Sequence, residues 1–362
     1  MLEKIAYAGA ASRSHAEASR FLDKLAGLLV DEKQVERVTR AVGDERLAER
    51  TTAVQAFQEL PLPQKFAVPV GIQAPELAVV MVDGGRMQIL DRSQGEATGD
   101  APLEGAAQRA GVDGDWEEEI CDSKGHWRED KVGLLMSMQS TVSAVDPCPE
   151  IPESFVAATR IPRLVRELKK NVKEAEEAVG DSDAPEAVEP ALTEEATYAP
   201  PEVAERHVVA SRSTWCSFAV LLAQAAWQGG FQGAARKAFV GDGSKNNWVL
   251  QRRFFASFVP ILDFIHALTY VFAAAMAGRK FSEGWPIYSR WITWVWQGQI
   301  AKVIAALVER QAELGKPAKD ESEASPRKVV DKALTYLRNH QDKMRYDEYR
   351  KAGLPITSSH VA

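Results

Sequence analysis

AVVMVDGG, at residues 78–85, is the segment from which the architecture can be read, and KAFVGDGSKNNW, at residues 237–248, repeats its form. Each segment has an apolar run suited to a buried strand and then places an aspartate, Asp83 or Asp242, directly before a glycine. Glycine permits a tight turn, so we expect both carboxylates to lie at the rim of a sheet. The plainer alternative is that an aspartate at a strand end only forms a turn.

Two carboxylates on neighbouring strands can share one hard divalent cation, and Mg²⁺ or Mn²⁺ is the ion that we expect here. Two-metal phosphoryl transfer places the ions about 3.5–4 Å apart. Asp83 would bridge both ions and Asp242 would bind one of them, although such a pair of ions usually has further carboxylate ligands. The two acids therefore indicate chemistry that cuts or joins phosphodiesters.

The chain has 362 residues, enough for one large domain and a smaller one, and a formal net charge of −7 at pH 7. A chain this acidic binds nucleic acid only through local basic patches. Its cysteines, Cys121, Cys148 and Cys216, lie far apart, which argues against a disulfide framework or a zinc site and fits a reducing cytoplasm. The first residues lack the long apolar core of a signal peptide.

Residues 254–278 form a long apolar stretch, which raises the alternative of a membrane span. Pro260, Asp263 and His266 stand near its middle, and each of them is costly in lipid. We therefore expect a buried strand followed by a buried helix, and no contact with a membrane.

The N-terminal region is expected to be helical. Residues 14–28 are predicted to form an amphipathic helix with four apolar residues on one face: Ala18, Phe21, Leu22 and Leu25. Asp31 can cap a second helix at residues 32–50. The apolar stripe of that second helix consists of Val35, Val38 and Val42.

The side of the second helix opposite its valines carries Lys33, Arg37 and Arg40. Two helices with a short turn and a basic outer side are typical of a helix-turn-helix region that contacts DNA. The alternative is a solvated helical hairpin, because the same helix also carries Glu32 and Glu36.

Five strands are expected, with a turn at Asp83-Gly84-Gly85 between the first two. Their ranges are 77–83, 86–91, 127–140, 236–243 and 259–266. Helices alternate with the later strands, which predicts an α/β fold with a mixed sheet covered by helices on both faces. In a ribonuclease-H-like sheet of this order, the first and fourth strands are neighbours, so Asp83 and Asp242 should meet.

The other helices are expected at residues 153–178, 201–227, 244–255, 267–278, 285–314 and 327–353. Pro286 fits the first turn of the helix at 285–314. Trp291 and Trp294 on that helix indicate either packing, which is the more common use of such a stripe, or stacking on bases beside Arg290 and Lys302.

Two groups outside the acid pair are candidates for phosphate contact, and one further acid is a candidate ligand. Lys245, Asn246 and Asn247 open a helix whose N-terminus favours anions. His266 either orients a phosphate or is a satisfied core residue. Asp263, which falls inside the fifth expected strand, is either a third carboxylate or a buried hydrogen-bond acceptor.

Several segments resemble insertion-sequence transposases of the ISKra type: MVDGGRMQI, HWREDKVGLL, FVGDGSKNNW, PILDFIHALTYVFAAAMAGR and YLRNHQDKMRYDEYRKAGLPITSSHV. The resemblance runs from about Ala6 to Val361. It implies a DDE-type enzyme on a ribonuclease-H-like fold with a helical insertion, in which Asp83 and Asp242 are the first two catalytic acids. It also favours DNA contact by the N-terminal helices.

The pattern and the resemblance together predict the following organisation. A helical, DNA-binding region covers residues 1–58, a linker 59–76, a ribonuclease-H-like core 77–280 with an acidic mobile segment at about 172–199, a helical insertion 281–326, and a C-terminal helix with a truncated tail 327–362.

In the family that this chain resembles, the segment corresponding to GLPITSS leads into the catalytic Glu and a basic stretch, and here that position falls at Ala362. The resemblance thus implies a transposase cut short before its third acid, inactive alone unless a frameshifted continuation supplies that acid. Its partners would be double-stranded DNA, as element ends and target, and a second copy or an intact transposase. It would work in the bacterial cytoplasm, at the nucleoid when bound to DNA.

Two other functions follow from the same residues. A non-catalytic DNA-binding remnant, acting as an inhibitor of intact transposase, needs only the fold and the basic residues Lys33, Arg37 and Arg40. A ribonuclease-H-like nuclease would use Asp83 and Asp242, but the transposase-like insertion and tail argue against it.

Overall fold

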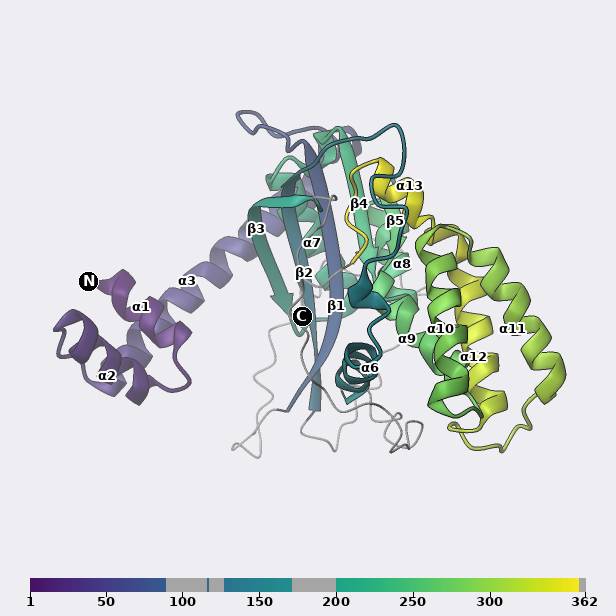
Figure 1. The fold of residues 1–362 in the computed structure, drawn as a ribbon. Helices are drawn as coiled ribbons and strands as arrows, with labels where there is room; N and C mark the ends of the chain where they lie inside the picture. The colour runs from purple at the N-terminus through teal and green to yellow at the C-terminus, as the bar shows by residue number, and fades with distance from the viewer. Residues whose placement is uncertain (89–115, 117–126, 171–199, 358–362) are drawn as a thin grey trace. The chain divides into compact units, whose positions relative to one another are not determined.

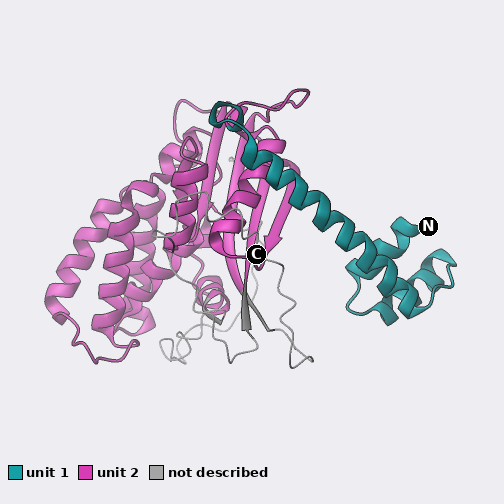
Figure 2. Cartoon of the chain, turned by 180° about the vertical axis from the view of Figure 1, so that it is seen from behind, with its two compact units in different colours: residues 1–65 teal, residues 66–362 magenta. Residues whose placement is uncertain are grey.

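The computed structural model describes residues 1–88, 116, 127–170 and 200–357 (Figure 1). The chain divides into two compact units, residues 1–65 and residues 66–362 (Figure 2). The expected loop at 93–116, apart from Trp116, lies outside the described residues, and so do the acidic segment at 172–199 and the last residues of the tail.

The strands are β1 (Leu77–Gln88), β2 (Trp127–Gln139), β3 (Glu202–Ser211), β4 (Arg236–Gly241) and β5 (Val259–Leu262). The helices of the first unit are α1 (Leu2–Ala11), α2 (His15–Ala26), α3 (Glu32–Glu59) and α4 (Leu62–Lys65). Those of the second are α6 (Arg160–Lys170), α7 (Trp215–Gln228), α8 (Lys245–Phe254), α9 (Phe264–Met276), α10 (Phe281–Trp296), α11 (Ile300–Leu314), α12 (Pro326–His340) and α13 (Tyr346–Lys351). Short 3₁₀ turns lie at Glu153–Phe155, Phe231–Gly233 and Gln341–Lys343.

The second unit is built on a five-stranded mixed sheet of order β3-β2-β1-β4-β5 (Figure 1). β2 pairs antiparallel with both β1 and β3, whereas β1, β4 and β5 run parallel. The expectation of an α/β fold with a mixed five-stranded sheet is therefore confirmed, as is the prediction that the strands carrying Asp83 and preceding Asp242 are neighbours.

The centre of the sheet is buried on both faces, since every residue of β1 from Leu77 to Val82 is at most 1% exposed. One face is covered by α7 and α8. A Cβ at Gly133 would meet Leu222 of α7, and Phe239 of β4 packs on Trp248 of α8. Val82 pairs with Gly133 and shares that face, so Asp83, the next residue along β1, points to the other face.

The turn expected at Asp83-Gly84-Gly85 is wrong, because β1 continues through both glycines to Gln88. Its partner β2, a 13-residue strand, pairs with every residue of β1 from Leu77 to Gln88. Neither glycine has a positive φ angle. A long antiparallel partner keeps the glycines extended, so residues 86–88 of the expected second strand continue the first, and residues 89–91 lie outside the described residues.

The helix expected from residue 201 is also wrong as far as residue 214, because residues 202–211 form β3. β3 pairs with β2 from Lys131 to Gln139. The unpaired edge of β2 supplies hydrogen bonds that local helix propensity does not anticipate. The helix itself begins later, as α7, where Thr214 accepts a hydrogen bond from the Ser217 amide.

Other expectations for the strands and helices also differ from the structure. The fifth strand ends at Leu262 rather than at residue 266, because Asp263 caps α9. The helix expected at 285–314 is two helices, since Gly298 adopts a positive φ of 70° between α10 and α11. Pro286 is not in a first turn, because α10 begins at Phe281. The helix expected at 327–353 is likewise divided, into α12, a 3₁₀ turn and α13.

The apolar stretch at 254–278 contains β5 and α9, and none of the described helices is both long and apolar enough to cross a membrane. Trp291 of α10 is 3% exposed and belongs to the core, in agreement with packing. Trp294 is half-buried, with Arg290 and Lys302 both over its ring.

In the first unit, the cap expected at Asp31 is confirmed, since Asp31 accepts from the Lys33 amide at the start of α3, and Ser14 likewise accepts from the Glu17 amide at the start of α2. The core of this unit consists of Ile5, Ala18, Leu22, Val35 and Val38. The expectation that Phe21 and Leu25 share the inner face of α2 is wrong.

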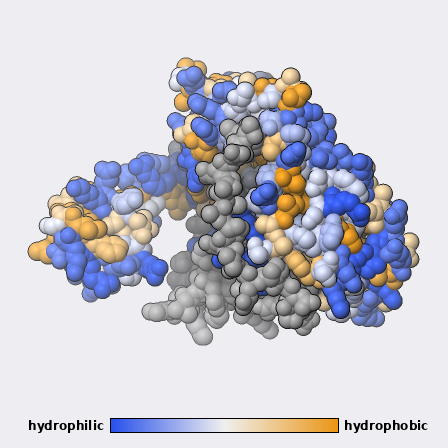
Figure 3. Space-filling view, viewed as in Figure 1, coloured by the Kyte–Doolittle hydropathy of each residue, from blue (hydrophilic) through white to orange (hydrophobic). Residues whose placement is uncertain are grey.

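Phe21 is 46% exposed and Leu25 is 84% exposed, and Figure 3 shows apolar side chains at the surface of this unit. The packed helices α1, α2 and α3 leave room for only a narrow apolar stripe on α2. Ala18 and Leu22, one turn apart, form that stripe, and the residues beside them face solvent.

A buried ion pair anchors the segment that follows β2 to the C-terminal helices. Arg350 of α13 has no exposed surface, and its guanidinium donates two hydrogen bonds to Asp146 and one to the Trp296 carbonyl oxygen, 3.0 Å away. It also lies over the Trp296 ring, 4.0 Å from the centroid. Burial raises the pKa of Asp146, but the hydrogen bonds from Arg350 and from the Cys148 amide outweigh it, and the net pKa is lowered.

Asp146→Asn should lower the free energy of unfolding by about 3–5 kcal/mol at neutral pH, because it leaves the charge of Arg350 buried without its partner. A lowered folded-state pKa means that the stabilisation is present above the unfolded-state pKa of 3.8 and is lost as the pH falls through the folded-state value. Urea unfolding of both proteins from pH 7 to pH 2 measures this.

The matched control is Glu348→Gln, which breaks the exposed pair of Glu348 with Arg345. It should change stability by less than about 1 kcal/mol. Equal effects of the two substitutions, or an Asp146→Asn difference that persists unchanged at pH 2, would contradict the assignment of a buried structural ion pair.

Candidate active site

Three aspartates lie at the same level of three adjacent parallel strands: Asp83 lies within β1, where its pairing with β4 ends, and Asp242 and Asp263 directly follow β4 and β5. Val82 of β1 is paired with Gly241 of β4, and Gly241 is paired with Leu262 of β5. The next residue in each strand direction is Asp83, Asp242 or Asp263. Parallel strands bring their carboxyl ends to one edge, which is where α/β proteins place their sites. We call these three residues the acid row.

The side chain of Asp242 is held by the turn that it begins. Its Oδ1 accepts hydrogen bonds from the Ser244 amide, at 2.9 Å, and from Asn247 Nδ2, at 2.8 Å. Asn247 also donates to the Val82 carbonyl oxygen at 3.3 Å, so one buried amide ties β1 to the acid that follows β4. Gly243 has a φ of 97°, which confirms the tight turn expected after Asp242.

Asp83 is half-buried, and its Oδ1 accepts a hydrogen bond from the Gly84 amide at 2.8 Å. Burial is the main cause that raises the pKa of Asp83, and the charge of Asp242 raises it further. The amide of Gly84 and the charge of His266 act in the opposite direction but do not compensate. Asp83 and Asp242 are therefore close enough to repel each other.

Asp263 is committed to a structural role. It is 1% exposed, and its Oδ1 accepts hydrogen bonds from the amides of Ile265, at 2.6 Å, and His266, at 3.3 Å, as the N-cap of α9. Of the two alternatives for this residue, the structure supports the buried acceptor, and it places Asp263 after β5 rather than inside it.

The other predicted site residues divide into two groups. His266 lies half-buried in the first turn of α9, close enough to influence the pKa of Asp83. Lys245 is exposed at the first position of α8, whereas Asn246 is 8% exposed and largely covered. Lys33, Arg37 and Arg40 belong to α3 in the first unit, where each is exposed on the side away from the buried valines.

Some of the basic residues on α3 already have partners on the same helix. Arg40 forms an i,i+4 ion pair with Glu36 at 3.3 Å, and Arg37 donates to Gln34 at 3.1 Å. The pairs are exposed and contribute little to stability, so they leave the guanidinium groups able to exchange partners. The exposed side of α3 is therefore compatible both with a surface that contacts DNA and with a solvated face.

Sequence reasoning recognised Asn247 only as part of a helix start and missed its contact with Asp242. It also missed Tyr336, whose hydroxyl donates to the Asp242 carbonyl oxygen at 2.6 Å. Asn247 follows Asp242 by five residues, a spacing that could have signalled the contact once α8 was placed. Tyr336 is 94 residues away along the chain, and no local pattern indicates it.

The acid pair fits a divalent cation by the chemistry of its donors. The hydrogen bonds from the Gly84 amide to Asp83, and from the Ser244 amide and Asn247 to Asp242, go to Oδ1, and carboxylate oxygens are the ligands that hard divalent cations prefer. The mutual repulsion of Asp83 and Asp242 is what a cation between them would relieve. Within the described ranges, however, no group of three or more His, Cys, Asp or Glu side chains is placed to hold a metal ion.

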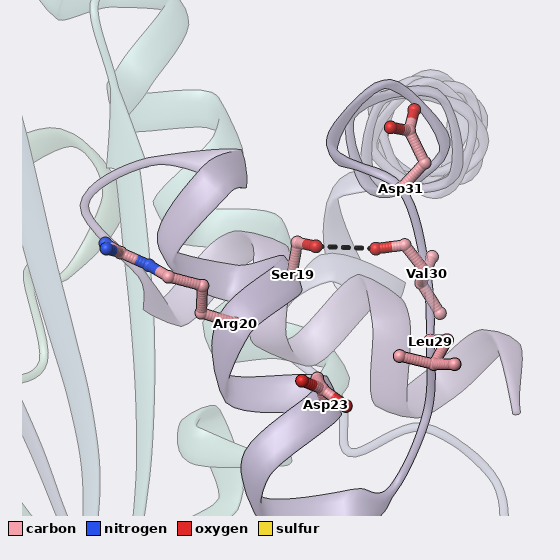
Figure 4. Close-up of a pocket in the computed structure, with 6 residues that line it drawn as sticks. All are labelled: Ser19, Arg20, Asp23, Leu29, Val30 and Asp31. Carbon is pink, nitrogen blue, oxygen red and sulfur yellow. Dashed lines mark hydrogen bonds between the residues drawn. The ribbon is translucent and has the colours of Figure 1, made fainter.

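A pocket of about 340 Å³ lies in the first unit, between α2 and the segment that leads into α3 (Figure 4). Its lining is Ser19, Arg20, Asp23, Leu29, Val30 and Asp31. Ser19 spans it by donating to the Val30 carbonyl oxygen at 2.6 Å. The pocket shares no residue with the acid row, and its polar side chains come from α2 and from Asp31, the cap of α3.

A scan against models of known protein families, a search of curated proteins and a search of solved structures each found no match to this chain. The site is therefore interpreted from its geometry.

Asn247→Asp should be more destabilising than Asn247→Ala, although the aspartate is the closer match in size. Asn247→Ala removes hydrogen bonds to Val82 and Asp242 and should cost about 1–3 kcal/mol. Asn247→Asp also places a carboxylate against that of Asp242. Chemical denaturation at pH 7 measures both values.

The double variant Asn247→Asp with Asp242→Asn isolates the electrostatic part. It should recover the excess cost of Asn247→Asp, because the second change removes the opposing charge. Equal costs of Asn247→Asp and Asn247→Ala in the presence of Asp242 would show that the two side chains do not interact as described.

Proposed function

We propose that this chain is a DNA transposase of the DDE type, on a ribonuclease-H-like fold, in which Asp83 and Asp242 hold divalent cations for phosphoryl transfer. The observation that carries the proposal is the acid row on a sheet of order β3-β2-β1-β4-β5. A turn with only a structural role needs neither two carboxylates that repel each other nor the buried Asn247 that joins β1 to Asp242. In a cation site, the ion relieves the repulsion and Asn247 fixes one of its ligands.

Asp83 and Asp242 would hold Mg²⁺ or Mn²⁺, which supplies charge stabilisation to a reacting phosphate. Asn247 and the Ser244 amide fix the carboxylate of Asp242 through Oδ1 and so orient Oδ2. Asp83 projects from the face of the sheet opposite α7. His266, in the first turn of α9, would contact a phosphate oxygen of DNA bound at this edge.

A third carboxylate would have to come from outside the acid row, because Asp263 is used as a cap. The proposal is supported by one contact of the C-terminal segment: the Ile356 carbonyl oxygen accepts a hydrogen bond from the Phe264 amide at 2.9 Å, beside Asp263. A carboxylate that follows this segment in the chain would be brought to the same edge of the sheet as Asp83. With two carboxylates alone, we expect cation binding without efficient strand transfer.

DNA binding without cleavage is the second candidate, and the commitment of Asp263 to α9 is the observation that favours it. The surface proposed for DNA is the exposed side of α3, with Lys33, Arg37 and Arg40. Such a chain would occupy element ends, as a homodimer or together with an intact transposase, and block their use.

Without divalent cations at pH 7, Asp83→Asn should be more stable than the wild-type chain. The raised pKa of Asp83 means that its ionised form is disfavoured in the folded state, so a neutral replacement removes that cost. With Mn²⁺ at tenfold its Kd, the wild-type chain should gain about 1.4 kcal/mol and the variant nothing. Thermal melts over a Mn²⁺ titration measure both effects.

Asp320→Asn, an exposed acid on the α11–α12 loop, is the matched control and should respond to Mn²⁺ as the wild-type chain does. If Mn²⁺ stabilises Asp83→Asn as much as the wild-type chain, the acid pair is not the cation site and the proposal fails.

Arg37→Gln combined with Arg40→Gln should weaken binding to a 30-base-pair duplex and reduce the slope of log Kd against log salt by about 1–2, because two phosphate contacts are lost. Lys316→Gln with Lys319→Gln removes the same charge from the α11–α12 loop and should change neither value. Fluorescence anisotropy over a salt series measures the slopes.

Labelled duplex incubated with the chain and Mn²⁺ separates the candidates. Salt-dependent binding without cleavage supports DNA binding alone. Strand joining that Asp83→Asn abolishes supports the transposase and contradicts the expected inactivity of two carboxylates. Cleavage without joining supports a nuclease, and no binding at low salt contradicts every DNA function.

A further inference from the structure

The turn that carries Asp242 is also contacted by α12, a helix distant in sequence. Tyr336 of α12 donates its hydroxyl to the Asp242 carbonyl oxygen at 2.6 Å. A Cβ on Gly243 would lie 2.7 Å from that hydroxyl, so the turn and the phenol are in direct contact and only glycine fits between them. Gly243 is therefore required both for its φ of 97° and for the approach of Tyr336.

Tyr336 is itself held in place by aromatic neighbours. Tyr270 of α9 stacks on it with ring centroids 3.7 Å apart and planes 11° from parallel. His340 meets its edge at 4.8 Å. Burial raises the pKa of Tyr336 well above that of a free phenol, and the nearby Tyr270 and Asp242 raise it further. The hydroxyl is therefore protonated at neutral pH and acts as a donor.

Asp242 is thus fixed at two points. α8 holds Oδ1 of the side chain through Ser244 and Asn247, and α12 holds the carbonyl oxygen through Tyr336. These two constraints lie on either side of Cα, so together they limit rotation of the Asp242 main chain as well as of its side chain. Pre-organisation of this kind is what a cation ligand needs if binding is not to cost ordering of the loop.

We propose that Tyr336, backed by Tyr270, is a positioning residue that sets the main chain at Asp242 and so the affinity of the acid pair for a divalent cation. The inference rests on the proposed function for the cation and adds the helices α9 and α12 to the site. α12 packs on both α9 and α11, so the helical layer beyond β5 controls the geometry of the second acid.

The test compares Tyr336→Phe with Tyr288→Phe in the full chain. Tyr288 makes the same kind of bond, from a buried hydroxyl to the Phe155 carbonyl oxygen at 2.9 Å, but it lies on α10 and touches no member of the acid row. Both variants lose one hydroxyl and keep the ring, so both should remain folded, with similar small losses in thermal stability.

Two readouts separate positioning from general destabilisation. Hydrogen–deuterium exchange of a peptide covering residues 241–247 reports the turn, where the Ser244 amide is bonded to Asp242. Electron paramagnetic resonance of free Mn²⁺ reports affinity. Tyr336→Phe should speed exchange of this peptide and weaken Mn²⁺ binding about fivefold, the effect of losing one hydrogen bond. Tyr288→Phe should change neither.

If Tyr336→Phe leaves hydrogen–deuterium exchange of residues 241–247 unchanged, the inference is overturned at any Mn²⁺ affinity. Faster exchange with unchanged Mn²⁺ affinity also overturns it, because the bond is then only structural. If Mn²⁺ binds the wild-type chain and Asp83→Asn equally, the proposed function fails, and the role of Tyr336 in a cation site fails with it. The Asp83→Asn arm thus tells these two failures apart.

Discussion

The second unit depends on one constraint, the parallel register of β1, β4 and β5. Val82, Gly241 and Leu262 stand side by side, so the residue after each lies at one level of one edge. That alignment brings together three aspartates that are separated in sequence by 159 and by 21 residues. Three helices contact them: α8 through Asn247, α9 through its cap Asp263, and α12 through Tyr336.

The members of the row have different uses because their surroundings differ. Asp263 is enclosed and satisfied by the first amides of α9, so its charge is bound within the fold. Asp242 is held through Oδ1 by α8. Burial, and then the charge of Asp242, raise the pKa of Asp83. Carboxylates with perturbed pKa values are common at functional sites.

Long-range polar contacts made by two arginines, Arg236 and Arg350, hold the C-terminal segment against the sheet. Arg236, at the start of β4, donates to Ser140 Oγ at 2.7 Å and to the Ala352 carbonyl oxygen at 3.1 Å. Arg350 joins Asp146 to the end of α10. These two arginines bind the C-terminal segment across the strands and direct it past the start of α9. Packing far from the acids thus determines what lies beside them.

The sequence by itself determined the α/β class, the buried strands before Asp83 and Asp242, the cap at Asp31, and the tight turn at Gly243, because apolar runs, capping side chains and glycine act over a few residues. Tertiary structure alone decided the rest. The glycines after Asp83 stay extended because β2 pairs beyond them, residues 202–211 form a strand because β2 has a free edge, and Asp242 is fixed by a tyrosine from α12. Each of these outcomes depends on a partner far away in the chain, and no local pattern contains that partner.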